Sequence, residues 1–140
     1  MPIRPELKPL YPGGGIRSAE WLALREHALD QANHCCEFCG AQHEHQIWRL
    51  ADGEFITAAG GVYCDRTGRL IRLSDPAMEG GTPIVIVLSL CHKDHDPAHN
   101  QPENHMVLCQ RCHLRHDADH HRQTRRRRNA IGDLFDRKIA

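Results

Sequence analysis

The stretch of sequence that decides the fold is LCHKDHDPAHNQPENHMVLCQRCHLRHD, residues 90–117. It starts at the end of the apolar run Ile84–Cys91, whose β-branched residues predict a single buried strand. A polar loop with two prolines follows, and His105–Cys109 predicts a second short strand. A helix is expected from Gln110 onward. The predicted order strand, loop, strand and helix brings the acidic and imidazole side chains of the loop close to the start of the helix.

Two CxxC pairs, Cys36–Cys39 and Cys109–Cys112, are spaced so that each pair can direct both sulfur atoms at one ion. Four thiolates suit a tetrahedral zinc site. A single CxxC is also found in redox motifs, but two pairs in a chain with seven Cys and 12 His indicate metal ligation. We therefore expect a structural Zn²⁺ that joins the N-terminal part of the chain to the C-terminal motif.

Asp94, His95 and His113 carry the second chemical signal of this stretch. A carboxylate and several imidazoles at the end of a strand and the start of a helix can hold one divalent cation. One imidazole then remains free to remove a proton from water, while the cation polarises a phosphodiester. Asp94 and His95 are adjacent, so they can share a site only where the backbone turns away from regular strand geometry.

These residues resemble the HNH (His-Asn-His) endonuclease family, in the small bacterial and phage type with flanking CxxC pairs. The resemblance covers about 30 residues, together with Cys36 and Cys39 upstream, and rests on several motifs in order. They are Asp94-His95, Pro102-Glu103-Asn104 and Leu108-Cys109-x-x-Cys112-His113. The resemblance implies an α+β fold with a ββα-metal motif. It also implies a metal-dependent DNA endonuclease that nicks or cleaves phosphodiester bonds by hydrolysis.

The resemblance further implies a role for each matching residue. His95 resembles the general base, Asp94 and His113 the ligands of the catalytic divalent ion (Mg²⁺, Mn²⁺, Zn²⁺ or Ni²⁺), and Asn104 the residue that orients the loop and the base. The chain departs from the family pattern in having His105 after Asn104, where an aliphatic residue is usual. Three further residues are possible additional ligands, namely His92, His116 and Asp117.

The remainder of the chain surrounds this motif. Residues 1–17, rich in Pro and Gly, predict a flexible extended arm, and a helix is expected near 19–33 behind the N-cap Ser18. Short strands are expected at 46–50, 54–57, 62–64 and 70–73, followed by a loop at 75–83. The predicted organisation is thus an endonuclease domain at 18–121, with a small antiparallel β insert at about 46–80, and a basic tail at 122–140.

The net charge of zero conceals an uneven distribution of charge. Residues 111–140 contain nine Lys or Arg against four Asp, a net +5, and the other 110 residues carry −5. A local basic region attracts a polyanion regardless of the total charge. Side chains of this kind neutralise phosphates without reading sequence, which predicts double-stranded DNA as partner with weak sequence preference. The expected contacts are Arg115, Arg122, Arg125, Arg126, Arg127 and Arg128. A solvated charged tail is the alternative interpretation of the run.

Other function classes are excluded or remain as alternatives. No run of about 18 apolar residues is present, so a membrane-spanning helix is not expected. The N-terminal sequence lacks the apolar region of a secretory signal, so we expect a cytoplasmic protein, bacterial or phage-encoded. The alternatives to a nuclease are a non-catalytic zinc-dependent nucleic-acid-binding module and a scaffold protein of a phage or prophage. The oligomeric state is left open.

Overall fold

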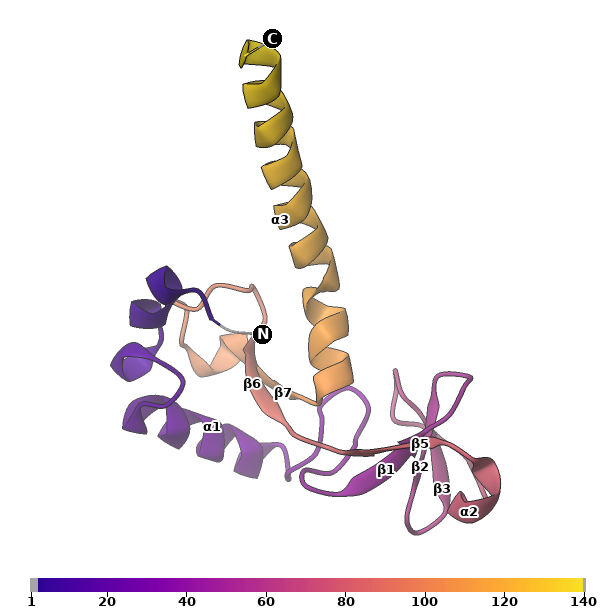
Figure 1. Ribbon diagram of the computed structural model, residues 1–140. Helices are drawn as coiled ribbons and strands as arrows, with labels where there is room; N and C mark the ends of the chain where they lie inside the picture. Colours follow the sequence, from indigo (N-terminus) through magenta and orange to yellow (C-terminus); the bar gives the residue numbers. More distant parts are fainter. Residues whose placement is uncertain (1–2, 140) are drawn as a thin grey trace.

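The computed structural model describes the backbone of residues 3–139 and the side chains of residues 3–132. It is an α+β arrangement with a five-stranded antiparallel sheet, a separate two-stranded hairpin and two principal helices. In Figure 1, helix α3 rises away from the rest of the chain, with the hairpin at its base, helix α1 beneath the hairpin and the sheet to one side. None of the described helices is both long enough and apolar enough to cross a membrane.

The five-stranded sheet has the strand order β4-β3-β2-β1-β5. Its strands are β1 (Gln46–Arg49), β2 (Glu54–Thr57), β3 (Gly61–Cys64), β4 (Leu70–Leu73) and β5 (Thr82–Val85). The first four confirm the strands expected from the sequence. Phe55 and Ile56 of the central strand are fully buried, whereas every residue of β4, at one edge, is exposed. Pro83 lies on the other edge strand, where a residue without an N–H is tolerated.

The predicted strand Ile84–Cys91 is wrong as one element. The chain instead forms β5 and then β6 (Ser89–His92), which belong to different sheets. The residues between β5 and β6 form hydrogen bonds with the loop that precedes β1. Ile86 N donates to His45 O, and Leu88 N donates to His43 Nδ1. The expected loop at 75–83 is also only partly correct. It contains the short helix α2 (Pro76–Glu79), capped by Asp75, and the start of β5.

The two-stranded hairpin joins β6 to β7 (His105–Leu108), with Ser89 opposite Leu108 and His92 opposite His105. Helix α1 (Ala19–Gln31) covers it and confirms the predicted N-terminal helix; its N-cap Ser18 accepts a hydrogen bond from Trp21 N at 3.1 Å. Trp21 and Leu29 are the residues of α1 buried in the core. The hairpin is thus supported from below by apolar packing.

The N-terminal segment is not the extended arm that its composition predicted. It forms two 3₁₀ helices, η1 (Pro5–Leu10) and η2 (Pro12–Gly14), each with a proline in its first turn. Proline fixes φ at a value that is compatible with a helical turn. It has no backbone N–H, but the first N–H groups of a helix have no partner within the helix, so no hydrogen bond is lost. Tyr11, between the two helices, packs edge-on against Trp21 and His92 with ring centroids 5.1 and 5.5 Å apart. The aromatic contact holds the segment on the hairpin.

Helix α3 (Gln110–Ile139) follows β7 after a single residue, which confirms the expected helix start. It contacts β6 and β7 near its beginning and continues without interruption through the arginine run. The predicted basic tail is therefore helical from 122 to 139. The side chains of its last residues, from 133 on, lie outside the described part of the chain.

Trp21→Ala is expected to lower the free energy of unfolding by about 3–5 kcal/mol, since it removes a large buried side chain and the partner of Tyr11. Urea denaturation followed by circular dichroism measures the change. Leu22→Ala, at a neighbouring residue that is 49 % exposed, serves as control and should alter stability by no more than about 0.5 kcal/mol. Equal losses in the two variants would show that α1 does not pack through Trp21.

Candidate metal centres

Four cysteines that are distant in sequence converge at the junction of the hairpin, α3 and the loop after α1. The cysteine cluster consists of Cys36, Cys39, Cys109 and Cys112, all of them buried, and their sulfur atoms lie within 4.8 Å of one another. The Cys39 and Cys109 sulfur atoms are 3.7 Å apart. Thiolates about 2.3 Å from a tetrahedral zinc ion are about 3.8 Å apart, whereas a disulfide requires about 2.05 Å. The donor set and its spacing therefore fit a metal ion such as zinc.

Backbone hydrogen bonds fix both halves of the cluster. In the first pair, Cys36 N donates to Ala41 O, and Gly40 N donates to Cys36 O, each at 2.9 Å. In the second pair, His113 N donates to Cys109 O at 2.9 Å as α3 begins. Glu37 N donates to Val107 O at 2.9 Å and joins the two pairs. The sulfur atoms are thus held in place by the chain around them.

The pKa is lowered for two of the four thiols, Cys36 and Cys109, and raised for the other two. Hydrogen bonds from Cys112, Cys36 and Cys39 lower the pKa of Cys109 strongly. The guanidinium of Arg49 also lies 3.9 Å from the Cys109 sulfur. The pKa values of Cys39 and Cys112 are raised, because each faces the charged Cys109. A bound cation would stabilise all four as thiolates, because a metal ion is ligated by the deprotonated form.

A second group of metal-ligating side chains lies where the loop after β6 meets α3. We call it the histidine–aspartate group: His95, His116 and Asp117, whose ligand atoms also lie within 4.8 Å of one another. His95 Nδ1 is 3.0 Å from Asp117 Oδ1, and its ring stacks on that of His116 with centroids 4.5 Å apart. His95 has a φ of +62°, in the left-handed region. This turn of the backbone directs His95 toward the helix.

One face of α3 supplies the helical part of this group. Residues 113, 116, 117 and 120 are separated by three or four positions and so lie on the same side of the helix. His113 Nε2 is 2.9 Å from the second carboxylate oxygen of Asp117. His120 stacks on His95 with centroids 4.5 Å apart, so the His95 ring has a neighbouring imidazole in His116 and another in His120. The helical spacing of these four residues was present in the sequence and could have indicated the group.

The environment of His95 favours its neutral form. Its pKa is lowered from the ordinary value, first by burial and then by repulsion from His116, although Asp117 acts in the opposite direction. A neutral imidazole can accept a proton or bind a metal ion.

Asp94 is not in the histidine–aspartate group, contrary to the expected ligand role. Its Oδ1 accepts hydrogen bonds from Asn104 Nδ2 and Asp96 N, each at 2.9 Å, and its Oδ2 is 2.7 Å from His99 Nδ1. These contacts, led by the one with His99, lower the pKa of Asp94 well below its usual range. Adjacent residues point in different directions, so the turn that brings His95 to the helix leaves Asp94 to close the loop.

Asn104 organises the same loop. It is 5 % exposed, and its side-chain oxygen accepts from Asp94 N at 3.2 Å. Its amide nitrogen donates to His99 O at 2.8 Å, in addition to Asp94. Lys93 N donates to the Asn104 backbone oxygen at 2.7 Å. These contacts suit the orienting role expected for Asn104 and do not bring its side chain into the histidine–aspartate group.

Two other expected ligands lie outside that group. His92 is buried, with Nε2 2.8 Å from Asn100 Oδ1 and its ring stacked on Trp21 at 5.5 Å between centroids. It belongs to the aromatic core between the N-terminal segment and the hairpin. His113 lies beside the group through its contact with Asp117. The structure therefore joins His95 to His116 and Asp117, two of the three residues named as further ligands, while Asp94 and His92 lie outside the group and His113 borders it.

Arg115, expected to contact DNA, forms an internal ion pair in the structure. Its guanidinium bonds both carboxylate oxygens of Asp65, at 3.2 and 3.0 Å, and Arg111 Nε lies 2.9 Å from the same carboxylate. Asp65 is 1 % exposed, directly after β3. No pattern in the sequence indicated this ion pair, because a single Asp in a predicted turn is ordinary.

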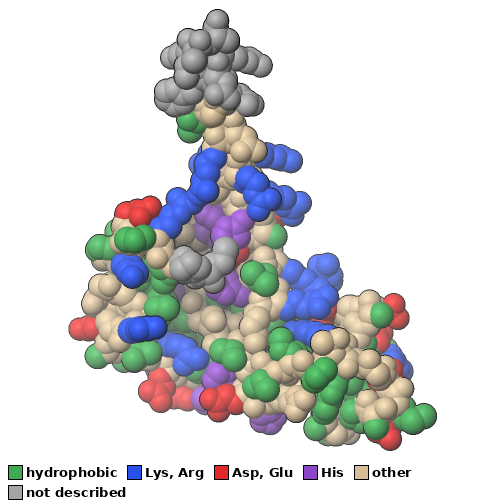
Figure 2. All heavy atoms as spheres, viewed as in Figure 1, with side chains coloured by type: hydrophobic (Ala, Val, Ile, Leu, Met, Phe, Trp, Pro, Cys, Tyr) green, Lys and Arg blue, Asp and Glu red, His purple; other side chains and the backbone are tan. Residues whose placement is uncertain are grey.

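The other expected basic contacts lie on the exposed part of α3. Arg122 pairs with Asp119 at 2.6 Å, and both side chains are exposed. The four arginines from 125 to 128 are exposed along the helix. Figure 2 shows histidine side chains gathered beside the lower part of α3, with basic side chains above them along the helix.

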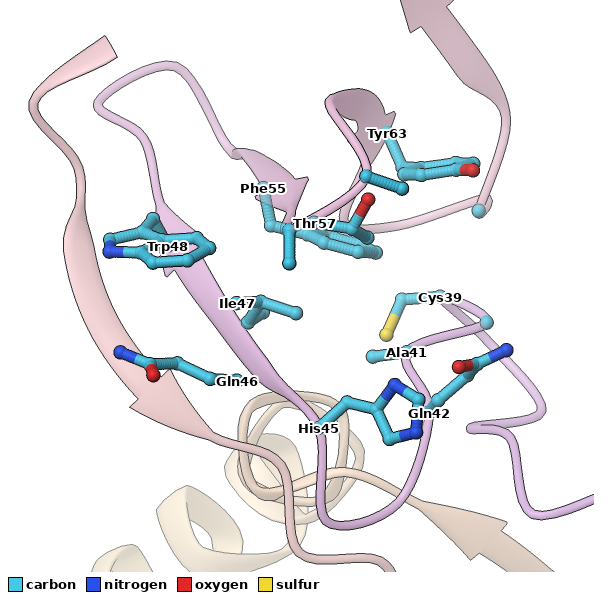
Figure 3. A pocket seen from close by; sticks show the side chains of 14 residues that line it. Cys39, Ala41, Gln42, His45, Gln46, Ile47, Trp48, Phe55, Thr57 and Tyr63 are labelled. Atoms are coloured by element: carbon cyan, nitrogen blue, oxygen red, sulfur yellow. The ribbon is translucent and has the colours of Figure 1, made fainter. Parts of the chain in front are cut away.

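One cavity lies beside the cysteine cluster and away from the histidine–aspartate group. Its volume is about 540 Å³. It lies between one face of the five-stranded sheet and the loop that follows Cys39. Figure 3 shows Ile47, Phe55 and Tyr63 on the sheet side and Cys39, Ala41, Gln42 and His45 on the other. It touches the cysteine cluster through Cys39, and the residues that line it do not include the histidine–aspartate group.

Comparison of this chain with family models, with curated proteins and with solved structures gave no match. The functional proposal consequently rests on the chemistry of the two ligand groups.

Cys39→Ser is expected to lower both the metal content and the melting temperature of the purified protein, since it removes one of four buried sulfur ligands. Mass spectrometry of the bound metal and thermal denaturation measure the two effects. Cys35→Ser is the matched control, because Cys35 is next to the ligand Cys36 in sequence but outside the cluster. Metal content near one zinc per chain in both variants would contradict the four-cysteine site.

Asp65→Ala is expected to destabilise the protein by about 2 kcal/mol in urea denaturation, because two guanidinium groups lose their buried partner. Arg111 and Arg115 are 41 % and 29 % exposed, so water offsets part of the loss. Asp52→Ala, at an exposed position of the same sheet region, provides the comparison. If both variants unfold at the same urea concentration as the wild type, Asp65 does not secure the helix.

Proposed function

We propose that this protein is a metal-dependent DNA endonuclease of the HNH type. The arrangement of β6, β7 and the first turns of α3 supports a ββα-metal motif, because the three elements follow one another in the order and pairing that the motif requires. His95, three residues after β6, and His113, directly after the second CxxC, stand at the sequence positions on which the resemblance rests.

The observation that carries the proposal is the convergence of His95, His116 and Asp117 at one point. Two imidazoles and a carboxylate suit a divalent transition metal such as Mn²⁺ or Ni²⁺. Neither a structural role nor simple binding of nucleic acid requires such a group beside a separate four-cysteine site. The group also lies next to the exposed, basic part of α3, where a phosphate backbone is attracted.

His116 and Asp117 are the proposed ligands, and His95 is the proposed general base. A proton on His95 Nδ1 held by Asp117 leaves Nε2 free to accept the proton of the attacking water. As the water oxygen bonds to phosphorus, the bond from phosphorus to the 3′ oxygen breaks, and the leaving oxygen takes a proton from solvent. The bound ion supplies positive charge for the phosphoryl oxygens and the leaving group.

The proposed substrate is double-stranded DNA with weak sequence preference. Arg125–Arg128 are exposed on α3 and suited to bind phosphates, a contact that carries no base code. A single catalytic group cuts one strand, so nicking is the default activity of one chain.

A plasmid-nicking assay with added Mg²⁺, Mn²⁺ or Ni²⁺ tests the proposal. The wild type should convert supercoiled plasmid to the open circular form, and His95→Ala should lower the rate by about 10²–10⁴-fold, as loss of a general base does. His27→Ala, at an exposed histidine of α1, should retain full activity. A folded protein with metal in its cysteine cluster that nicks DNA with none of these ions would favour the zinc-dependent binding module instead.

Titration calorimetry with Mn²⁺ separates the two roles available to His95. If it is the base, His95→Ala should bind Mn²⁺ with wild-type affinity, whereas Asp117→Asn should lose both ion binding and nicking. Loss of Mn²⁺ binding in His95→Ala would assign His95 to the ligand set. Unchanged nicking by Asp117→Asn would remove the histidine–aspartate group from the reaction.

A further inference from the structure

Phe38 occupies an unusual position at the tip of the first CxxC pair. Its side chain is 44 % exposed, although Cys36 and Cys39 on either side of it are buried in the cysteine cluster. The backbone of this turn is held by hydrogen bonds from Cys36 N to Ala41 O and from Gly40 N to Cys36 O. The protein thus presents an aromatic ring to solvent on a fixed turn.

A small cavity lies between this ring and the base of α3. Its volume is about 210 Å³, smaller than the cavities that hold drug-sized ligands. Its lining comes from three separate parts of the chain, namely Phe38, Asp65, Arg66, Cys112, Arg115 and His116. His116 belongs both to this lining and to the histidine–aspartate group, so an occupant of the cavity lies against the proposed reactive centre.

The charge of the cavity is positive where it meets solvent. The Asp65 carboxylate is neutralised by Arg111 and Arg115. Glu37, next to Phe38, directs its carboxylate to the backbone N–H of Val107. Arg66 is exposed and has no salt-bridge partner among the described residues. Figure 2 shows basic side chains gathered where the base of α3 meets the sheet. An aromatic face and a free guanidinium therefore border the same small hollow.

We propose that Phe38 and Arg66 form a nucleotide-binding subsite beside the histidine–aspartate group. Arg66 binds a backbone phosphate and the ring of Phe38 stacks on the unpaired base of the adjoining nucleotide. Arginine pairs with phosphate through charge-assisted hydrogen bonds, and an exposed aromatic ring stacks on any base. The subsite rests on the proposed function and adds to it a preference for DNA with an unstacked base next to the cut.

Binding without cleavage tests the subsite separately from catalysis. Fluorescence anisotropy, with no divalent ion added, measures the affinity for a labelled duplex that carries one unpaired 2-aminopurine. Phe38→Ala should weaken binding roughly tenfold with an unchanged salt dependence, because base stacking is lost. Phe38→Trp should restore it. Arg66→Gln should reduce the slope of log K against log salt by about 1, as loss of one phosphate contact does.

Two control variants and the fluorescence of the 2-aminopurine base test the subsite independently. Leu22→Ala changes an exposed apolar residue, and Arg69→Gln changes an arginine in the same turn region as Arg66. Neither residue lines the cavity, so both variants should bind DNA like the wild type. The wild type should quench 2-aminopurine and Phe38→Ala should not. The metal content of each variant establishes that the cysteine cluster is intact.

The outcomes separate the subsite from the function on which it rests. Wild-type affinity and quenching in Phe38→Ala would overturn the subsite while leaving the nuclease proposal in place. If the wild type binds DNA and quenches 2-aminopurine but never nicks DNA, the nuclease proposal is overturned and the subsite proposal stands. A wild type that binds no DNA would overturn both.

Discussion

The convergence of four thiols is the constraint on which the rest of the molecule depends. Cys39 and Cys109 are 70 residues apart in sequence, yet their sulfur atoms lie 3.7 Å from each other. The whole five-stranded sheet lies between them in the chain. A bound cation would close this long loop in the folded state and contribute folding free energy directly. The cluster also fixes the first turn of α3, because Cys112 belongs to that turn and His113, His116 and Asp117 follow within two more.

The five-stranded sheet secures α3 from another side. Asp65, at the end of β3, holds Arg111 and Arg115 from successive turns of the helix, and its backbone oxygen lies 3.8 Å from the Cys112 sulfur. The β insert, which had no evident purpose in the sequence, thus helps to set the direction in which the helix leaves the cysteine cluster. The aromatic core of Tyr11, Trp21 and His92 supports the hairpin on the opposite side.

The sequence predicted those features that depend on local pattern. Helix α1 followed from its N-cap and apolar spacing, the first four strands from short segments next to turn residues, and the cysteine cluster from two CxxC pairs. The split between β5 and β6 was missed, because the hydrogen bonds from Ile86 and Leu88 to the 43–45 loop are long-range. For the same reason the direction of the Asp94 side chain could not be predicted. It depends on the left-handed turn at His95 and on Asn104, which no periodicity encodes.

Helix α3 runs from Gln110 to Ile139 without a break. An α-helix advances about 1.5 Å and rotates about 100° per residue, so Arg126 lies roughly 15 Å along the axis from His116. The helix therefore fixes both the distance along its axis and the angle around it between its imidazole and guanidinium groups. One residue inserted after Asp117 would swing every arginine beyond it to another side of the axis while leaving the cysteines untouched.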